Sequence, residues 1–426
     1  MYLLLSVPYL ARVIISLFAI MAFQKLTGNL AAAMALGTVI LAFWTGQNAG
    51  STFGIAWDRF FSQDTMFLVL VIAGVICLSS LMSEAGIMKD LVICLRSRLS
   101  KRSLLAALPA VVGLLPMPAG ALFSAPLIDD ADSSKTLDNL QKTRINFWFR
   151  HIWEFWWPLY PGVLLAVDIS GLPIWLFVLI LCPLFFAAIA AGYAFLFKNI
   201  PQGKPDLRGA AEDKPFPVLI LPILAVIGVY CLLLIALPAL TRCNKYLPMF
   251  IGVLAGLAVF QRQRPAPAAA WQRNLFSKRL CGLVLIIILA RIYGAFIEAE
   301  LPDGILLMVK IRSELDSYGI PALALVVLIP FISGLTTGIT VGYIGASFPI
   351  ALSLAGAARG EFYSVIIISY TSGFLGMMLS PIHVCLLVTN DYFKTSLIES
   401  LAGLLRPALM LLACAVMYAS IWYALG

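Results

Sequence analysis

Long apolar segments separated by short polar loops run along almost the whole chain. A helix needs about 20 apolar residues to cross a hydrocarbon core about 30 Å thick, and ten segments approach that length. In the first half they are residues 4–24, 28–46, 65–85, 146–168 and 172–197. In the second half they are residues 216–240, 246–261, 280–298, 362–390 and 400–425. The pattern predicts an all-α polytopic membrane protein with ten transmembrane helices.

Two further apolar segments, residues 103–128 and 320–352, contain prolines and glycines that a smooth spanning helix would avoid. Irregular backbone at membrane depth is tolerated only where protein buries it or where it lines a wet cavity. We therefore expect both segments to form re-entrant hairpins, which enter the membrane and return to the same side.

Basic residues on both sides of the first broken segment agree with a hairpin. The stretch "KDLVICLRSRLSKR" precedes it and "KTLDNLQKTRINFWFR" follows it. Lys and Arg collect in cytoplasmic loops, so both stretches belong on the cytoplasmic side, and only a returning segment permits this. The same rule places the central loop in the cytoplasm and both termini outside. The second hairpin then enters from the outer face.

The polar segment 198–215 divides the chain into two halves with the same order of expected elements. A constant shift of 223 positions pairs four identical residues, among them Ser124 and Ser347. Residues 1–197 and 216–426 are therefore expected to be two repeats, each with five spans and one hairpin. Because five is odd, the second repeat is inverted relative to the first, an arrangement found in many transporters.

Composition narrows the classes of function. Hydrophobic residues make up 62% of the chain and charged residues 12%, which excludes a soluble domain. The net charge of +8 reflects basic loops beside a membrane, so we expect no nucleic-acid partner. Eight cysteines without a CxxC spacing predict no disulfide or metal framework. The chain has no GxxxxGK[ST] motif for ATP, and no cofactor is expected.

The tips of the two hairpins are the first candidates for a binding site. Such tips bring free backbone groups and helix termini close to the middle of the membrane. The candidate ligands for substrate or ion in the two hairpins are Pro118, Gly120, Ser124, Ser333, Gly334, Thr336, Thr337 and Thr340. The oxygens of Ser333, Thr336 and Thr337 could hold a transient Na⁺. The alternative is that these small residues only permit close helix packing.

Two of the expected spans are interrupted by prolines, which free backbone carbonyls. In the first, Arg150 and Glu154 are spaced i, i+4, and with His151 they form a candidate group for proton coupling or charge pairing. The alternative is that Arg150 and His151 anchor the span at the membrane interface beside tryptophans. The candidate ligands in the second interrupted span are Ser380, His383, Thr389 and Asn390.

Three further expectations concern single residues in the spans. His151 and His383 lack the neighbouring ligands of a metal motif, so no resident metal site is expected. His383, two residues after Pro381, should either bond a freed carbonyl or touch a ligand. Arg291, in the middle of a span, should pair within the protein, for example with Glu298, or bind an anion.

The stretches "LPMPAGALFSAPLIDDA", "FWFRHIWEFWWPLYPGVLL" and "SGLTTGITVGYIGASFPI" closely resemble the membrane family DUF401. Together with "SPIHVCLLVTNDYF", they make the chain similar to the ion transporter superfamily of arsenite, citrate, dicarboxylate, gluconate and sodium–proton carriers. The resemblance implies inverted repeats and a homodimer with a scaffold part and a moving transport part. Dicarboxylate carriers bear Ser-Asn-Thr motifs at their hairpin tips. The asparagine is absent from both tips here, which argues against a dicarboxylate substrate with paired sodium ions.

The sequence therefore predicts a secondary active transporter for a small organic anion, coupled to H⁺ or Na⁺, with elevator-like alternating access. We expect a homodimer in a prokaryotic inner membrane, in contact with lipids, and no enzymatic activity. An ion channel and a Na⁺/H⁺ antiporter-like carrier are competing interpretations. A more remote one is an intramembrane lipid-processing enzyme that uses His151, Glu154 and His383.

Overall fold

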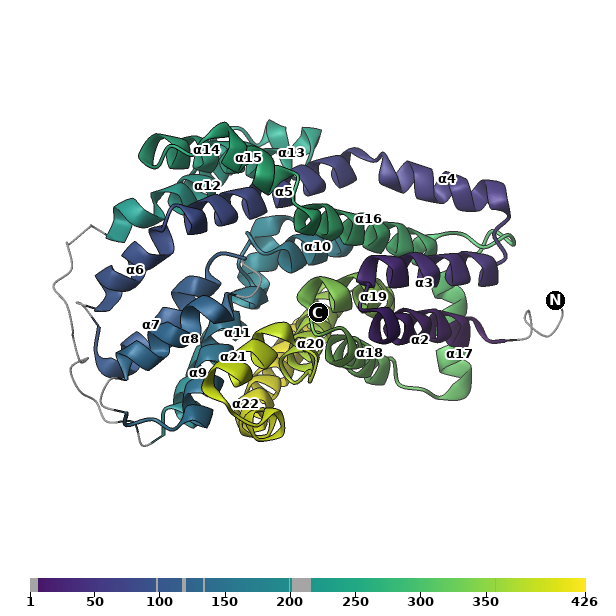
Figure 1. The fold of residues 1–426 in the computed structure, drawn as a ribbon. Coiled ribbons are helices and arrows are strands. Elements are labelled where there is room, and N and C mark those ends of the chain that lie inside the picture. Colours follow the sequence, from purple (N-terminus) through teal and green to yellow (C-terminus); the bar gives the residue numbers. More distant parts are fainter. Residues whose placement is uncertain are drawn as a thin grey trace.

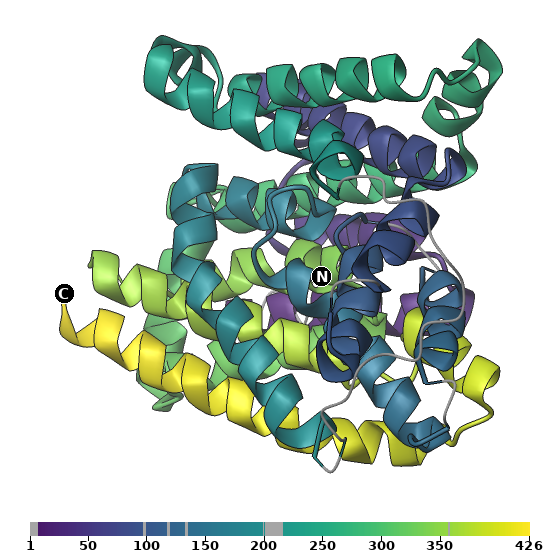
Figure 2. The same cartoon turned by 90° about the vertical axis from the view of Figure 1, so that its left-hand side faces the viewer.

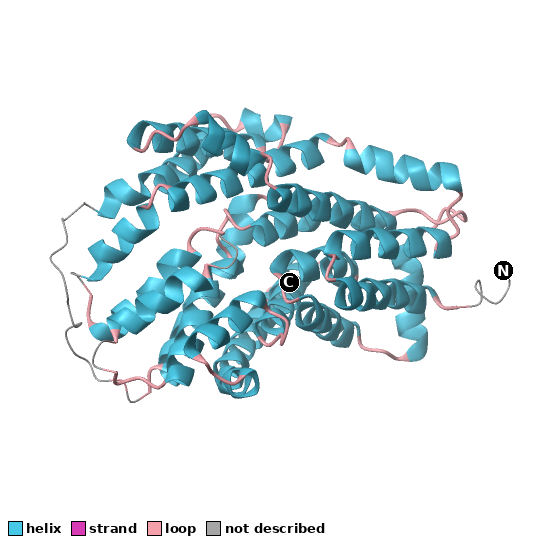
Figure 3. Cartoon of the chain, in the orientation of Figure 1, coloured by secondary structure: helices cyan, strands magenta, loops and turns pink. Residues whose placement is uncertain are grey.

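The structure is a computed structural model that describes residues 7–96, 99–116, 120–132, 135–198, 200, 216–356 and 358–426. Every regular element in these ranges is a helix (Figure 3). Pro118 and most of the expected central linker, residues 199 and 201–215, lie outside the described residues.

The helices of the first half are α2 (Tyr9–Thr27), α3 (Leu30–Trp44), α4 (Ala49–Phe60), α5 (Gln63–Glu84), α6 (Ile87–Arg96), α7 (Lys101–Gly113), α8 (Ala121–Ala131), α9 (Asn139–His151), the 3-10 helix η1 (Ile152–Phe155), α10 (Pro161–Ser170) and α11 (Ile174–Leu196). Those of the second half are α12 (Phe216–Ala236), α13 (Ala239–Cys243), α14 (Leu247–Gln263), α15 (Ala268–Leu275), α16 (Lys278–Glu298), α17 (Leu307–Tyr318), α18 (Ala322–Thr337), α19 (Thr340–Ser353), α20 (Arg359–Met378), α21 (Val384–Phe393) and α22 (Leu397–Ala424).

Among the described residues, six helical segments are long and apolar enough to cross a membrane, which makes the chain a multi-pass membrane protein. They are α2, α5, α11, α12, α15 with α16, and α22. The remaining expected spans are shorter or broken. Helices α3 and α14 have 15 and 17 residues, and α9–α10 and α20–α21 are each interrupted. The predicted total of ten spans requires these elements to cross as well, and it stays a prediction.

Helix pairs occupy both segments that were expected to form hairpins. The legs α7 and α8 have 13 and 11 residues, and the legs α18 and α19 have 16 and 14. At about 1.5 Å per residue, each leg is shorter than the hydrocarbon core of about 30 Å. Figure 1 places α7 with α6 at one end of the molecule and α17, which leads into α18, at the opposite end. This arrangement agrees with hairpins that enter from opposite faces, which remains a prediction.

The bounds of several helices follow the shift of 223 positions that the sequence suggested. Helices α10 and α21 span Pro161–Ser170 and Val384–Phe393, so both of their ends differ by 223. Helices α11 and α22 begin at Ile174 and Leu397, which differ by the same number. Pro158 and Pro381, in the breaks before α10 and α21, differ by 223 as well. So do Gly171 and Lys394, the left-handed residues that end these two helices.

Small residues let neighbouring helices approach closely. Helix α14 packs on α12 through Gly252 and Gly256, where an added Cβ would lie 2.5 Å from the Val226 carbonyl oxygen and 2.7 Å from that of Pro222. Figure 2 shows these two helices as an outer layer over one side of the molecule. The hairpins and interrupted helices lie on the other side. Any residue larger than glycine at these contacts would force α12 and α14 apart.

Buried charges hold the base of the first hairpin. Lys101 Nζ lies 2.8 Å from Asp132 Oδ1, and Lys142 Nζ on α9 lies 3.4 Å from Asp132 Oδ2. The backbone N–H groups of Thr136 and Leu137 donate to the same carboxylate. Burial opposes the ionisation of Asp132, but hydrogen bonds from Lys101, Thr136 and Leu137 outweigh it and lower the pKa of Asp132 to about 2. The network ties the α7–α8 pair to α9.

Candidate functional site

A cavity of about 460 Å³ lies where both hairpin tips meet the breaks in both interrupted helices. It is closed on one side by α16, whose first residues Lys278 and Arg279 line it. The lining residues are Ile76, Pro116, Arg150, His151, Glu154, Tyr160, Pro161, Gly162, Lys278, Arg279, Gly282, Leu283, Ile286, Ile339, Thr340, Val341, Met377, His383, Val384 and Cys385. Charged side chains from elements far apart in the sequence thus share one cavity.

The first interrupted helix places three charged or polar side chains at this cavity. Helix α9 ends at His151, and the following turn, η1, is a 3-10 helix that contains Glu154. The expectation that Arg150 and Glu154 share one α-helical face is therefore wrong, because the α-helix does not continue between them. Both residues still line the same cavity, since the tighter turn and the break before Pro161 redirect the chain.

Glu154 connects three separate elements. Its side-chain atom Oε2 accepts a short hydrogen bond from the hydroxyl of Thr340, the first residue of α19 after the second hairpin tip. Its Oε1 lies 3.9 Å from His151 Nε2. Its backbone carbonyl accepts a 2.6 Å hydrogen bond from the Tyr370 hydroxyl on α20. A change in the charge of Glu154 would therefore directly alter its hydrogen bond to Thr340 in the second hairpin.

Arg150 and His151 are buried inside the protein, with exposed fractions of 3% and 0%. The alternative of an interfacial anchor is therefore wrong for these two residues. Arg150 Nη1 lies 3.4 Å from His151 Nε2 and 3.4 Å from Cys385 Sγ. The guanidinium also lies against Gly120 at the first hairpin tip, where any Cβ would collide with it. Glycine at position 120 lets the first hairpin lie directly against this guanidinium.

The second interrupted helix contributes His383 and Cys385, on either side of the start of α21. The ring nitrogens of His383 form no hydrogen bond with any described residue, so of the two alternatives for His383, the bond to a freed carbonyl is not made there. His383 instead faces His151, with ring centroids 4.8 Å apart. One ligand atom from each of His151, His383 and Cys385 lies within 4.8 Å of the others. The expectation that the histidines lack neighbouring metal ligands is therefore wrong.

The hydroxyl groups of the second hairpin differ in their positions. Thr336 and Thr337 donate to the Ser333 carbonyl on their own helix, and only Thr340 lines the cavity. The Ser333 hydroxyl is buried and forms no hydrogen bond with the described residues. Gly334 packs directly on the Gly373 carbonyl of α20. For Gly334, the alternative role in helix packing therefore has direct geometric support.

The remaining candidates do not line the cavity. Ser124 donates to the Gly120 carbonyl within α8, and Ser380 donates to the Leu335 carbonyl at the break after α20. Thr389 donates to the Cys385 carbonyl on the same helix. Asn390 accepts from the hydroxyls of Thr395 and Ser400, so it joins α21 to α22.

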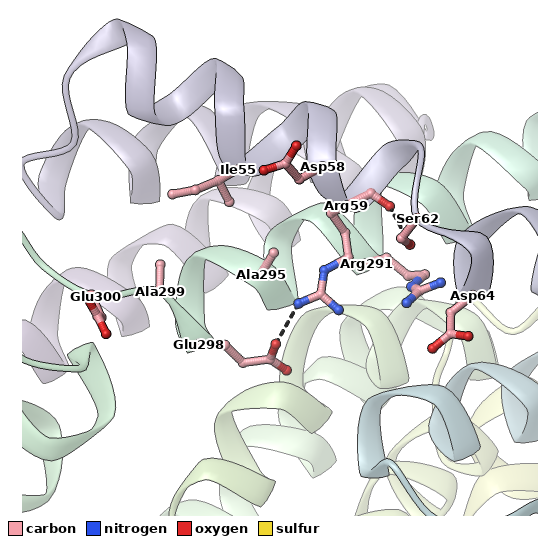
Figure 4. A pocket seen from close by; sticks show the side chains of 10 residues that line it. All are labelled: Ile55, Asp58, Arg59, Ser62, Asp64, Arg291, Ala295, Glu298, Ala299 and Glu300. Atoms are coloured by element: carbon pink, nitrogen blue, oxygen red, sulfur yellow. Dashed lines mark hydrogen bonds and ion pairs between the residues drawn. The ribbon is translucent and has the colours of Figure 1, made fainter. Parts of the chain in front are cut away.

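A second pocket, of about 650 Å³, lies at the other end of α16 (Figure 4). Arg59 Nη2 lies 2.6 Å from Glu298 Oε2 in this pocket, and a dashed line marks this ion pair in Figure 4. Arg291 also lines the pocket, but its Nε lies 2.8 Å from Asp168 Oδ2 on α10. The expected pairing of Arg291 with Glu298 is therefore wrong, whereas its pairing within the protein is confirmed.

These helices define the class of the molecule, a multi-pass membrane protein with a cavity, lined in part by charged side chains, between two helix pairs and two interrupted helices. Its fold is similar to the crystal structure of the Alcanivorax borkumensis YdaH transporter, with a TM-score of 0.60 over 89% of this chain and 90% of that chain, at 13% sequence identity. No functionally curated protein matches the sequence. Residues 10–421 match the family model "Protein of unknown function (DUF401)", and the chain belongs to this family, as its sequence stretches had indicated.

Proposed function

We propose that the protein is a secondary active transporter for a small organic anion, such as a carboxylate, in a prokaryotic inner membrane. The observation that carries the proposal is Arg150, which is buried and lines a cavity reached by both hairpins. A guanidinium binds a carboxylate through two parallel hydrogen bonds, and the low local dielectric strengthens them. Lys278 and Arg279 in the lining add positive potential that attracts anions. The similarity of the fold to the YdaH transporter also supports the proposal.

The coupling ion in this proposal is a proton carried by Glu154. Glu154 faces the same cavity as Arg150, whereas the hydroxyls of Thr336 and Thr337 are directed to their own helix. Protonation would remove the negative charge that competes with an anion for Arg150. The proton and the anion would then bind together, which is the requirement for symport. A sodium site built from Ser333, Thr336 and Thr337 is the competing scheme.

Transport in this proposal uses elevator-like alternating access. The hairpins and interrupted helices would move as one part relative to a scaffold that includes α12 and α14, and that scaffold would form the homodimer. Lys278 and Arg279 follow a basic loop that the positive-inside rule assigns to the cytoplasm. The described cavity would therefore be open toward the cytoplasm.

The orientation can be tested with single cysteines labelled in sealed membranes. Ser100 and Lys135 are exposed at the base of the first hairpin, and Arg312 is exposed on α17. Cysteines at positions 100 and 135 should react with a membrane-impermeant reagent from the cytoplasmic side, and a cysteine at 312 from outside. Reaction of positions 100 and 135 from opposite faces would contradict the inverted arrangement.

A lipid-processing enzyme is the second candidate function, and one observation favours it. Such an enzyme would need His151, Glu154 and His383 close together, and all three line one cavity. Incubation of the purified protein with membrane lipids, followed by product analysis, would reveal this activity. Absence of any product from protein that binds and transports an anion would exclude it.

The transport proposal is tested first by finding the substrate. Purified protein should be screened for thermal stabilisation by organic anions, in sodium and in choline buffers. A stabilising anion should then enter proteoliposomes with saturable kinetics and should exchange with internal unlabelled anion. Flux without saturation or exchange would favour a channel, and anion-independent exchange of Na⁺ for H⁺ would favour an antiporter.

A further inference from the structure

The cluster of His151, His383 and Cys385 has a composition that anion binding does not explain. Its three ligand atoms lie within 4.8 Å of one another, and all three side chains are buried. His151 belongs to the end of α9, whereas His383 and Cys385 flank the start of α21. The cluster therefore lies between the two interrupted helices, at the wall of the cavity.

Two features of the histidines point to a ligand. His151 Nδ1 donates to the Phe147 carbonyl at 2.6 Å, which leaves a lone pair on Nε2 directed toward the cluster. Metal-binding histidines characteristically make this second hydrogen bond to a carbonyl or carboxylate, which fixes the tautomer. His383 is only 5% exposed, and neither of its ring nitrogens bonds a described residue. A buried imidazole without a partner is unfavourable, and a metal ion would satisfy it.

The donor set selects the kind of metal. Two imidazole nitrogens and one sulfur suit Zn²⁺, and three protein ligands leave its fourth position open to the cavity. Bonds of about 2.0–2.3 Å place tetrahedral ligands roughly 3.5 Å apart, so the present cluster must contract by about 1 Å. Glu154 Oε1 lies 3.9 Å from His151 Nε2 and is close enough to supply a fourth ligand or a compensating charge.

Arg150 is the main obstacle to a cation here, because its Nη1 lies 3.4 Å from both His151 Nε2 and Cys385 Sγ. A cysteine thiolate and the Glu154 carboxylate would together offset the charge of Zn²⁺. The guanidinium would then have to move away from the two ligand atoms. Metal binding and anion binding through Arg150 are therefore expected to compete.

We propose that His151, His383 and Cys385 form a binding site for a thiophilic divalent metal ion such as Zn²⁺. When occupied, this site links the two interrupted helices. Metal binding itself does not depend on the transport proposal. Its predicted consequence, that the metal opposes anion binding, does rest on the proposed function.

The direct test is titration of the purified, tag-free protein with Co²⁺, which replaces Zn²⁺ and reports a sulfur ligand by a charge-transfer absorption band. The wild-type protein should bind about one Co²⁺ per chain with this band, and Zn²⁺ should displace it. Cys385→Ser should remove the band. His383→Gln should weaken Co²⁺ binding more than about tenfold, because even outer partners of metal ligands contribute that much.

The matched control is Cys414→Ser, since Cys414 is half-buried on α22 and is not part of the cluster. This variant should keep the band and the wild-type affinity. Thermal unfolding without metal should show that each variant is folded, and His151→Gln provides a further ligand variant if one fails. Absence of the band from folded wild-type protein, or its persistence in Cys385→Ser, would overturn the metal site. Neither result would alter the anion screen, so the two proposals fail separately.

Discussion

Two of the buried charge clusters among the described residues differ in how their charges are compensated. At one end of α16, the Asp168 carboxylate lies 2.8 Å from Arg291 Nε and 3.2 Å from Lys245 Nζ, and it accepts a 2.8 Å hydrogen bond from the Tyr246 hydroxyl. In the cavity, the Glu154 carboxylate is bonded by the neutral hydroxyl of Thr340, and Nε2 of His151 is 3.9 Å away.

The difference separates a structural cluster from a candidate binding cluster. Asp168 is held by opposite charges on α16 and on the segment before α14, so a ligand would have to break direct ion pairs to enter. Glu154 is held by a neutral group from a hairpin, and it faces a cavity that also contains Arg150. Buried ionisable groups in membranes are expensive, and those that line a cavity mark pathways for ligands or protons.

The largest expected effect is on stability, at the structural cluster. Asp168→Asn should lower the free energy of unfolding by about 3–5 kcal/mol, because it leaves the buried Arg291 without its carboxylate. Glu154→Gln should cost much less, since Gln can still accept from Thr340. Thermal unfolding in one detergent would compare them. The double variant Asp168→Leu with Arg291→Met should recover most of the loss, and equal losses for Asp168→Asn and Glu154→Gln would contradict the distinction.

The next effect is on ligand affinity, at the cavity. Arg150→Gln should weaken binding of the anion found in the screen by about 1.5–3 kcal/mol, or roughly tenfold to a hundredfold, through loss of charged hydrogen bonds. The affinity would be measured by titrating the protein with the anion and monitoring either its thermal stabilisation or the heat of binding. Arg59→Gln is the control, because Arg59 pairs with Glu298 in the second pocket. An unchanged affinity in a folded Arg150→Gln variant would place the anion elsewhere.

Replacement of a glycine by leucine should have different effects on stability and anion binding in the two hairpins. Gly334→Leu forces side-chain atoms against the Gly373 carbonyl, and such overpacking should cost about 1–3 kcal/mol of stability. Gly120→Leu collides with the Arg150 guanidinium, a side chain that can shift, so it should reduce anion binding more than stability. Unfolding and binding measurements on both variants would separate these effects. If Gly334→Leu were stable and only Gly120→Leu unfolded, the packing assignment would be incorrect.

The smallest effects concern the hydroxyls of the second hairpin. Thr340→Val removes the hydroxyl that donates to Glu154. The initial rate of proton-driven uptake should therefore change by about a few-fold, which corresponds to about 1 kcal/mol. Thr337→Val removes a hydroxyl that donates to the Ser333 carbonyl on the same helix, so uptake should change less. Initial rates of uptake at several values of pH would reveal the difference. A larger effect of Thr337→Val, together with a requirement for sodium, would favour the sodium scheme.

Local sequence signals predicted the elements of the fold well. Prolines and glycines in apolar segments located both helix pairs and both interrupted helices, because these residues restrict or free the backbone wherever they occur. The shift of 223 positions, found from a few identical residues, also fits the bounds of α10 and α21. The ends of the helices were harder to predict from the sequence. The end of α9 at His151 depends on contacts with neighbouring helices, and an i, i+4 spacing gave no sign of it.

The candidate site was predicted in part. Arg150, His151, Glu154, Thr340 and His383 all line the cavity. Cys385 was missed as a candidate, although its spacing of two residues from His383 was visible. The proximity of His383 to His151 could not be read from one sequence, because the two are far apart in the chain and meet only through packing. The same limit applied to the Arg291–Asp168 pair, whose partners lie on different halves of the molecule.

The coupling of protons to anion transport through Glu154 can be tested in proteoliposomes with an imposed pH gradient and no sodium. Wild-type protein should accumulate the anion above its external concentration. Glu154→Gln should still exchange internal for external anion, because the cavity and Arg150 remain, but it should lose accumulation driven by the gradient. Accumulation that requires sodium and ignores the pH gradient, or full gradient-driven uptake by Glu154→Gln, would contradict this role of Glu154.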